Sequence, residues 1–251
     1  MSHEPTIVLV HGAFADASSW SGVVERLLQQ GHHVIAPANP LRGLATDSAY
    51  IASYISQIEG PTILVGHSYG GAVISNAASA AKNVLALVFV AGFAPETGET
   101  LGGAEANSKD SVLNAALVQR LYPAGKNGET APEFVVDPAK FHDAFASDVP
   151  EKQSAVMAAT QRPVAAGAFS EASGPPAWKT IPSWAVVAVG DKAAGTDVIR
   201  SMAKRAGAKT VELKGSHVIM VSQPQAVTDV ILEALQAVAK LAAGIGARNK
   251  T

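Results

Sequence analysis

Short runs of β-prone apolar residues recur along this chain, and most are followed by a segment with helical periodicity. A strand that is apolar on both faces fits a parallel sheet that helices cover on both sides. The alternation therefore predicts an α/β fold with a mostly parallel, twisted sheet flanked by helices. The expected strands are residues 6–10, 33–36, 62–65, 84–90, 184–189 and 210–213, and the expected helices are residues 20–30, 46–58, 69–81, 196–206 and 224–241. The candidate N-caps are Asp16 or Ser18 for the first helix and Thr46 or Asp47 for the second.

The alternation stops between residues 93 and 182, where no strong buried strand is expected. The helices expected in this stretch are residues 111–121, 138–146 and 150–160, joined by loops rich in Gly, Pro and Glu. Core strands resume afterwards, and a length of 251 residues fits one large α/β domain. We therefore expect an α/β core of residues 1–92 and 183–251, with residues 93–182 inserted as a helical cap.

Composition narrows the classes of function. Hydrophobic residues make up 48% of the chain and charged residues 16%, so a sizeable buried core is available. Cysteine is absent, which excludes disulfides, thiolate metal sites and a cysteine nucleophile. A net charge of −2 without a basic stripe gives no reason to expect a nucleic acid or membrane partner. No apolar stretch reaches the ~20 residues that cross a bilayer, and the first residues lack signal-peptide features, so we expect a cytoplasmic protein.

The third expected strand runs into the sequence Gly66-His67-Ser68-Tyr69-Gly70-Gly71. Gly-x-Ser-x-Gly between a strand and a helix is the context of a nucleophile elbow. Small residues around the serine permit a strained turn, and the N-terminus of the following helix favours a developing negative charge. The motif alone also fits a Gly-rich turn with a solvent-facing serine. Ser68 as a nucleophile therefore requires a base and an acid elsewhere in the chain.

Among the seven histidines, His217 is the predicted base. A serine hydroxyl needs a base whose pKa is near the working pH, and this is usually histidine. His217 follows the last expected strand, at the sheet edge where ligands collect in open α/β folds. His11 also follows a strand, but we interpret it as a buried residue that fixes the loop of Gly12. The side chain of His67 is expected to diverge from that of Ser68 at the turn.

Asp191 is the predicted acid, because it closely follows the expected strand 184–189 and should face the same edge of the sheet. Its carboxylate would fix the tautomer of His217 and stabilise the imidazolium. Asp197 is the main rival, although its position in the first turn of a helix equally fits a stabilising N-terminal charge.

The chain order Ser68, Asp191, His217 is that of the α/β-hydrolase fold. The whole chain resembles this superfamily, and most of all its small-capped branch of plant methylesterases, hydroxynitrile lyases and bacterial carboxylesterases. The matching segments are His11-Gly12-Ala13-Phe14 with Trp20, Gly66 to Gly71, Asp191-Lys192, and Gly215-Ser216-His217-Val218. The resemblance implies a catalytic triad of Ser68, His217 and Asp191.

The resemblance also implies an oxyanion hole made of two backbone N–H groups. They are those of Tyr69 and Ala13, with Phe14 as the alternative to Ala13. Losing one such donor typically costs ~10²–10³ in turnover. The side chains of Phe14 and Tyr69 fit a pocket border and ordinary packing equally well. The residues expected at the substrate are Gly12, Phe14, Phe93 and Val218.

The nucleophile and its neighbours favour ester hydrolysis. A serine at this position argues against haloalkane dehalogenases and epoxide hydrolases, which use an aspartate. The resembling hydroxynitrile lyases have a threonine in place of Gly12 and a lysine in place of Val218, so cyanohydrin cleavage is disfavoured. We expect a carboxylesterase-like serine hydrolase that cleaves small, hydrophobic esters through an acyl-enzyme, without a metal or other cofactor. The alternatives are perhydrolase or cofactor-free haloperoxidase chemistry, C–C hydrolysis, a lyase, a hydrolase-fold small-molecule receptor or a scaffold.

Substrate identity is expected to depend on the inserted segment. Its apolar residues either line the pocket or pack within the insertion, and the candidates are Phe93, Leu121, Phe141, Phe145, Met157 and Trp178. A homodimer is common in such enzymes, although no apolar stripe in the sequence identifies a subunit interface.

Overall fold

A computed structural model of the protein describes residues 4–125 and 127–248. Its centre is a six-stranded sheet with the order β2-β1-β3-β4-β8-β9, in which every neighbouring pair is parallel. The predicted α/β architecture is therefore confirmed. The strands are β1 Thr6–Val10, β2 Val34–Ile35, β3 Thr62–His67, β4 Val84–Val90, β8 Ser183–Ala188 and β9 Lys209–Leu213.

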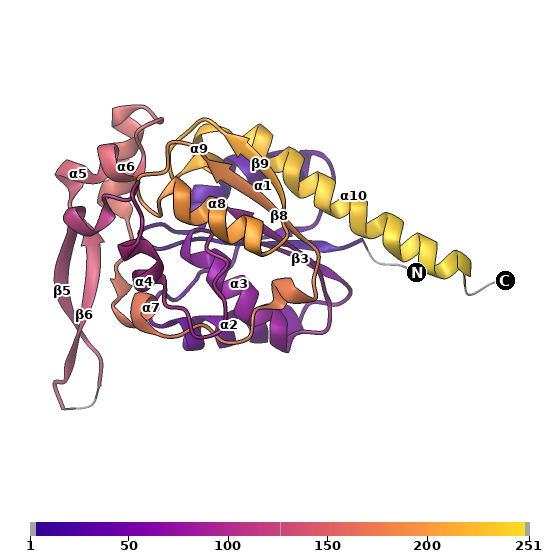
Figure 1. Ribbon diagram of the computed structural model, residues 1–251, viewed down its shortest axis with the longest axis horizontal. Coiled ribbons are helices and arrows are strands. Elements are labelled where there is room, and N and C mark those ends of the chain that lie inside the picture. The colour runs from indigo at the N-terminus through magenta and orange to yellow at the C-terminus, as the bar shows by residue number, and fades with distance from the viewer. Residues whose placement is uncertain (1–3, 126, 249–251) are drawn as a thin grey trace.

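Helices cover both faces of this sheet (Figure 1). Helices α1 and α10 pack against one another on one face, and α2 and α3 do so on the other. The bounds are η1 Ala17–Trp20, α1 Ser21–Gln29, α2 Leu44–Ser56, α3 Tyr69–Ala80, α8 Thr196–Arg205, α9 Ile219–Ser222 and α10 Pro224–Arg248. Asp16 caps the 3₁₀ turn η1 by accepting the N–H of Ser18, whereas α1, for which Asp16 or Ser18 was the predicted cap, has Trp20 in the N-cap position and no side-chain cap. Among the described residues, no helix combines the length and the apolar character needed to span a membrane.

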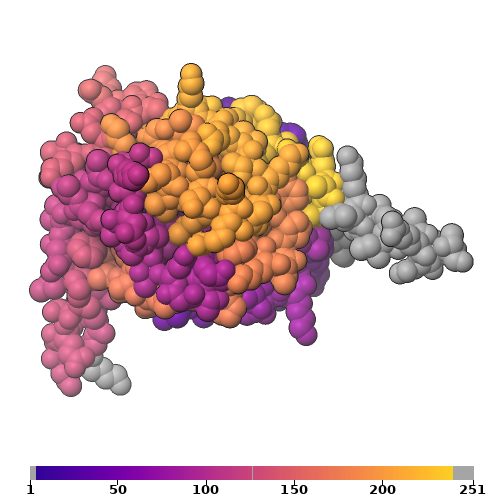
Figure 2. All heavy atoms as spheres, in the orientation of Figure 1, coloured from indigo at the N-terminus to yellow at the C-terminus, as the bar shows by residue number. Residues whose placement is uncertain are grey.

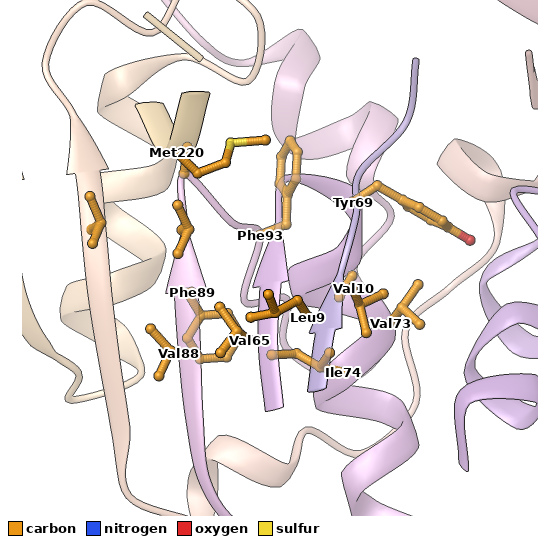
Figure 3. Close-up of a cluster of buried hydrophobic side chains, with 14 of the residues drawn as sticks. Leu9, Val10, Val65, Tyr69, Val73, Ile74, Val88, Phe89, Phe93 and Met220 are labelled. Carbon is orange, nitrogen blue, oxygen red and sulfur yellow. The ribbon is translucent and has the colours of Figure 1, made fainter. Parts of the chain in front are cut away.

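The central strands and α3 share a densely packed apolar core. Figure 3 shows side chains of three neighbouring strands packed together with those of the helix that follows Ser68. The labelled strand and helix residues at its centre include Leu9, Val10, Val65, Val73, Ile74, Val88 and Phe89, and all are buried. Burying one such side chain stabilises a fold by about 1.5–3 kcal/mol. The turn between β3 and α3 therefore lies directly above a fully buried apolar cluster.

Residues 93–182 differ most from the sequence expectation. Helices α5 Pro138–Phe145 and α6 Glu151–Thr160 lie where they were predicted. The helix expected over residues 111–121 is wrong, because the 3₁₀ turn η2 Leu113–Ala116 leads there into strand β5 Leu117–Pro123. Strand β5 pairs antiparallel with β6 Thr130–Val136, which pairs with β7 Val164–Ala165. The insertion is thus a three-stranded sheet with short helices, and a purely helical cap is wrong.

The insertion covers one side of the molecule, with the β5–β6 hairpin projecting away from the central sheet (Figures 1 and 2). Its remaining elements are α4 Leu101–Ala106, α7 Gly167–Ser170 and η3 Ala177–Lys179. The sequence of β5 mixes apolar and polar residues, so both helical and strand periodicity fit it. Pairing with β6 stabilises this segment as a strand, and such tertiary pairing cannot be predicted from the sequence of β5 alone.

Candidate active site

Ser68 forms the turn between β3 and α3, with φ 51° and ψ −123°. A positive φ is strained for a residue other than glycine and persists only where the surroundings enforce it. Here the N–H of Ser68 donates to the carbonyl of Val90 (3.2 Å), and its carbonyl accepts from Gly71 (2.9 Å) and Phe93 (3.1 Å). The side chain is buried to 6% exposure at the carboxyl end of the sheet.

Two glycines allow the backbone segments to approach one another at this turn. A Cβ at Gly66 would lie 2.4 Å from the carbonyl oxygen of Gly70, and a Cβ at Gly12 would lie 2.7 Å from the Cβ of Ser68. Non-bonded atoms do not approach so closely, so any larger residue would push the segments apart. Gly12 therefore brings the loop after β1 directly against the serine.

His217 and Asp191 form a buried hydrogen-bonded pair. The Nδ1 of His217 lies 2.8 Å from Oδ2 of Asp191, and each side chain is 1% exposed. The other carboxylate oxygen accepts the N–H groups of Ala193 (2.9 Å) and Ala194 (3.0 Å). Because Nδ1 donates to the carboxylate, Nε2 of His217 is the nitrogen that can accept a proton. The arrangement is that of a general base oriented by an acid.

The rival acid, Asp197, forms hydrogen bonds with residues other than His217. Its carboxylate accepts hydrogen bonds from the Ser108 hydroxyl (2.6 Å) and the Lys109 N–H (2.8 Å). Asp197 also lies in the first turn of α8. It fixes the loop after α4, and the structure pairs His217 with Asp191 instead.

His67 is a neighbour of His217 that the sequence interpretation missed. Its Nε2 donates to the carbonyl of His217 (2.9 Å), and the two ring centroids are 4.7 Å apart. Complete burial and the nearby His217 hold the pKa of His67 well below its usual value, so the ring is neutral. The side chain does diverge from Ser68, but it turns toward the loop of the base. Only the fold brings these two residues together.

His11 fixes the loop after β1, in agreement with its interpretation from the sequence. Its Nε2 accepts the N–H of Asn39 (2.9 Å), which leaves Nδ1 to donate to the carbonyl of Gly12 (2.9 Å). Burial lowers the pKa of His11 to about 4, so the imidazole is neutral near neutral pH. With both nitrogens occupied, His11 is a structural residue.

Two backbone N–H groups border Ser68 from different loops. Tyr69 is the first residue of α3, so its N–H has no acceptor within the helix and lies at the positive end of the helix dipole. Ala13 follows Gly12 on the loop after β1 and is buried. Within the described ranges, no residue accepts the N–H of Ala13. The two groups can serve as the donors of an oxyanion hole.

The side chain of Tyr69 ties the elbow to α2. Its hydroxyl donates to Oδ2 of Asp47 (2.7 Å), which also accepts the N–H of Arg42 (3.1 Å). Burial raises the pKa of Asp47 and, together with the Asp47 carboxylate, that of Tyr69. The prediction that Thr46 or Asp47 caps α2 is wrong. The helix begins earlier, at Leu44 with Gly43 in the N-cap position, and Asp47, inside its first turn, accepts the hydrogen bond of the Tyr69 hydroxyl.

Aromatic side chains connect the insertion with the elbow. The ring of Phe145 on α5 lies 4.9 Å from that of His217 and 6.1 Å from that of Phe14. Phe169 on α7, which the sequence interpretation did not single out, stacks on Phe14 (6.2 Å) and lies 6.5 Å from the ring of Tyr69. The residue before His217, Ser216, donates to the carboxylate of Asp148 between α5 and α6. The insertion therefore contacts the base and the oxyanion loop directly.

The other expected substrate residues are distributed unevenly. Phe93 and Val218 are buried, and Figure 3 shows Phe93 beside Met220 near the ends of the strands. Met157 and Phe14 line a hollow of about 210 Å³ between α6 and the loop after β1. Trp178 donates from its indole to the carbonyl of Pro95 and packs within the insertion. Leu121 neither lines a pocket nor packs within the insertion, because it is 65% exposed on the hairpin.

Comparison with known proteins agrees with the fold. The model of a family described as "Alpha/beta hydrolase family" matches residues 7–230. A carbendazim hydrolyzing esterase from Nocardioides sp. (strain SG-4G) is 33% identical over 107 residues, which are 38% of this chain and 44% of that protein. The matched region thus spans less than half the length of this relative.

Solved structures share the fold over nearly the whole chain. Polyneuridine aldehyde esterase superposes with a TM-score of 0.77 at 18% identity, covering 92% of this chain and 99% of that one. A pyrethroid hydrolase from Sphingobium faniae JZ-2 gives a TM-score of 0.74 at 21% identity, covering 94% and 99%. At these identities the likeness concerns the fold alone.

Proposed function

The chain belongs to the alpha/beta hydrolase family, and on that premise we propose that it is a serine hydrolase cleaving small, hydrophobic carboxylic esters through an acyl-enzyme. The observation that carries the proposal is the buried 2.8 Å hydrogen bond between His217 and Asp191. The loop of His217 also contacts the elbow of Ser68, because the carbonyl of His217 accepts a hydrogen bond from His67. A carboxylate, an imidazole and a serine on a strained turn are the parts that acyl transfer requires.

In the proposed mechanism, the Oγ of Ser68 attacks the ester carbonyl while Nε2 of His217 takes its proton. Asp191 keeps the proton of His217 on Nδ1 and stabilises the imidazolium. The N–H groups of Ala13 and Tyr69 hold the oxyanion of the tetrahedral intermediate. His217 then protonates the leaving alcohol, and water attacks the acyl-enzyme by the same route. Apart from the attacking water, each step uses groups of this chain and of the ester.

The relatives support ester hydrolysis as the general reaction. One is named an esterase for carbendazim, and the structural neighbours include an esterase and a pyrethroid hydrolase. The apolar surroundings of the serine, with Phe14, Phe93 and Phe145 buried nearby, favour an apolar ester.

The surroundings of Gly12 favour hydrolysis over cyanohydrin cleavage. A threonine in its place, as in the resembling lyases, would begin with a Cβ only 2.7 Å from that of Ser68. Val218 is completely buried and supplies no ammonium for a cyanide leaving group. Hydrolysis, in which water accepts the acyl group, needs neither that threonine nor a lysine in place of Val218.

The experiment that tests this proposal combines labelling and turnover. A fluorophosphonate probe and short p-nitrophenyl esters are applied to the wild-type protein, to Ser68→Ala and to Ser79→Ala, whose serine is exposed at the end of α3. We expect Ser68→Ala to lose labelling and to lose turnover by about 10⁴-fold or more, with Ser79→Ala unchanged. An unlabelled wild-type protein, or labelling that persists in Ser68→Ala, would contradict the proposal.

A further inference from the structure

An open cavity of about 290 Å³, bordered by the exposed residues Asn114 and Gln119, lies between α4, the β5–β6 hairpin and α7. Its wall combines apolar and polar side chains, namely Glu105, Asn114, Leu117, Gln119, Phe134 and Phe169. Ligand sites of this kind are mostly apolar, with a few polar groups that fix orientation. The cavity is large enough for an aromatic ring with one substituent.

Two observations connect this cavity with the triad. Phe169, one of its walls, stacks on Phe14 and lies 6.5 Å from the ring of Tyr69, next to the nucleophile. On the opposite side, the hydroxyl of Ser111 joins Glu105 (3.2 Å) to the carbonyl of Ala193 (2.6 Å). Ala193 in turn donates its N–H to Asp191. Two residues of the cavity wall, Phe169 and Glu105, are therefore linked by contacts to the oxyanion loop and to the acid of the triad.

Glu105 is the ionisable side chain of this wall and is only 5% exposed. The Ser111 hydroxyl donates toward Oε1 of Glu105 (3.2 Å) and toward the Ala193 carbonyl (2.6 Å), which is the nearer acceptor. Burial raises the pKa of Glu105 to about 7. The Asp191 charge acts in the same direction, whereas Ser111 and His217 oppose it. The carboxyl group thus changes charge near neutral pH.

Other charged groups around the cavity face away from Glu105. Arg120 and Glu133 alternate with the lining residues Gln119 and Phe134 along their strands, and Glu133 pairs with Arg42 at 2.7 Å. Glu171, beyond α7, accepts the N–H of Ala45. Within the described part of the chain, no residue donates a hydrogen bond to Oε2 of Glu105. That oxygen is available to a molecule in the cavity.

We propose that Glu105 is a specificity-determining residue of the esterase site proposed above, accepting a hydrogen bond from an N–H group of the substrate. The inference rests on that proposed function. The favoured substrates are esters with an aromatic or similarly flat group that carries an N–H donor. Asn114 and Gln119 offer further polar contacts on the same wall, and the apolar residues hold the ring.

The test compares esters that differ only by an amino or a methyl group of similar size. One pair is 3-aminophenyl and 3-methylphenyl acetate, with the donor on the alcohol side. The other is phenyl 3-aminobenzoate and phenyl 3-methylbenzoate, with the donor on the acyl side. The ratio of kcat/KM for amino over methyl ester is measured between about pH 6 and about pH 8.5, where the aromatic amine is uncharged. Taking the ratio cancels any effect of pH on the triad itself.

We expect this ratio to rise about tenfold with pH for one pair, as Glu105 becomes a charged acceptor. In Glu105→Gln the ratio should stay flat, whereas Glu151→Gln, an exposed control on α6, should follow the wild-type curve. Ratios that are flat for both pairs in the wild-type protein, or a rise that persists in Glu105→Gln, would overturn the inference. The wild-type curve decides this even if Glu105→Gln does not fold. Absence of any Ser68-dependent hydrolysis would instead contradict the proposed function.

Discussion

Around Ser68 the backbone segments pack so closely that an added Cβ atom would collide with a neighbour, whereas residues 93–182 contact the site largely through aromatic side chains. At the elbow, single Cβ atoms at Gly12 or Gly66 would collide with neighbouring atoms. In the insertion, Phe145 and Phe169 contact Phe14 of the loop after β1, and β5 is largely exposed. The comparison suggests that the chemistry depends on a rigid backbone, and that substrate choice depends on side chains that can be exchanged more freely.

The largest expected effect within the rigid region is that of Asp191→Asn. An asparagine keeps the shape but favours the wrong tautomer of His217, so kcat should fall by about 10⁴-fold. Asp197→Asn is the matched control, because Asp197 binds Ser108 and Lys109 instead of His217. Steady-state kinetics with a p-nitrophenyl ester measure both variants, and equal losses would contradict the assignment of the acid.

Gly12→Ala tests whether close backbone approach controls the oxyanion site. Its Cβ would lie 2.7 Å from that of Ser68, so the loop that carries Ala13 must move. We expect a loss of ~10²–10³ in kcat, equivalent to one oxyanion donor. Gly207→Ala is the control, since it adds a Cβ in open space at φ +64° and should reduce only stability, by about 1 kcal/mol. Unchanged turnover in Gly12→Ala would show that the loop is not part of the site.

The stability of the rigid region should depend on pH through His11. Its pKa is about 4 in the folded protein and about 6.5 when unfolded, so the unfolded chain binds more protons between these values. The free energy of unfolding should therefore fall by roughly 3 kcal/mol as the pH drops from about 6.5 to about 4. Glu105, with a raised pKa, acts in the opposite direction, so the comparison with His11→Gln isolates the histidine. Denaturant titrations at both pH values measure the free energy of unfolding. An equal pH dependence in the wild-type protein and in His11→Gln would refute the assignment.

Two variants of His67 test whether the elbow positions the base, His217. Removing its donor in His67→Leu leaves the buried carbonyl of His217 unpaired, which should cost about 1–3 kcal/mol of stability. We expect kcat to fall about tenfold with little change in KM, because the shifted loop misplaces the imidazole. His67→Gln retains an N–H donor and should recover part of kcat. Equal kcat values in the Leu and Gln variants would argue against a positioning role.

The smallest effect is expected for a substitution on the β5–β6 hairpin of the insertion. Leu121 is 65% exposed, so Leu121→Ser should change stability by less than about 0.5 kcal/mol and leave kcat/KM unchanged. Thermal melting and ester kinetics provide the check. A large loss of activity would mean that the hairpin takes part in catalysis, and the contrast between the two regions would then be wrong.

The same contrast explains which features could be predicted from the sequence. The sheet and the elbow follow from continuous apolar runs and from glycines whose spacing is local, so β3, α3 and their turn were predictable. The order of Ser68, Asp191 and His217 in the chain suggested a pairing that the structure brings together for His217 and Asp191.

The features that were missed depend on contacts between distant segments. Strand β5 was mistaken for a helix because its pairing with β6 is not visible in its own periodicity. His67 acts on a carbonyl 150 residues away, and Glu105 meets the network of Asp191 only through Ser111 and Ala193. Such relations need the folded chain, since no local pattern encodes them.

The central claim is that Ser68 carries an acyl group during turnover. The most direct measurement is mass spectrometry of the wild-type protein, quenched in acid during steady-state hydrolysis of a p-nitrophenyl ester, followed by peptide mapping. The account predicts one acyl group per chain, located on Ser68 and absent from Ser68→Ala. Continued turnover without an adduct, or an adduct on another residue, would contradict it.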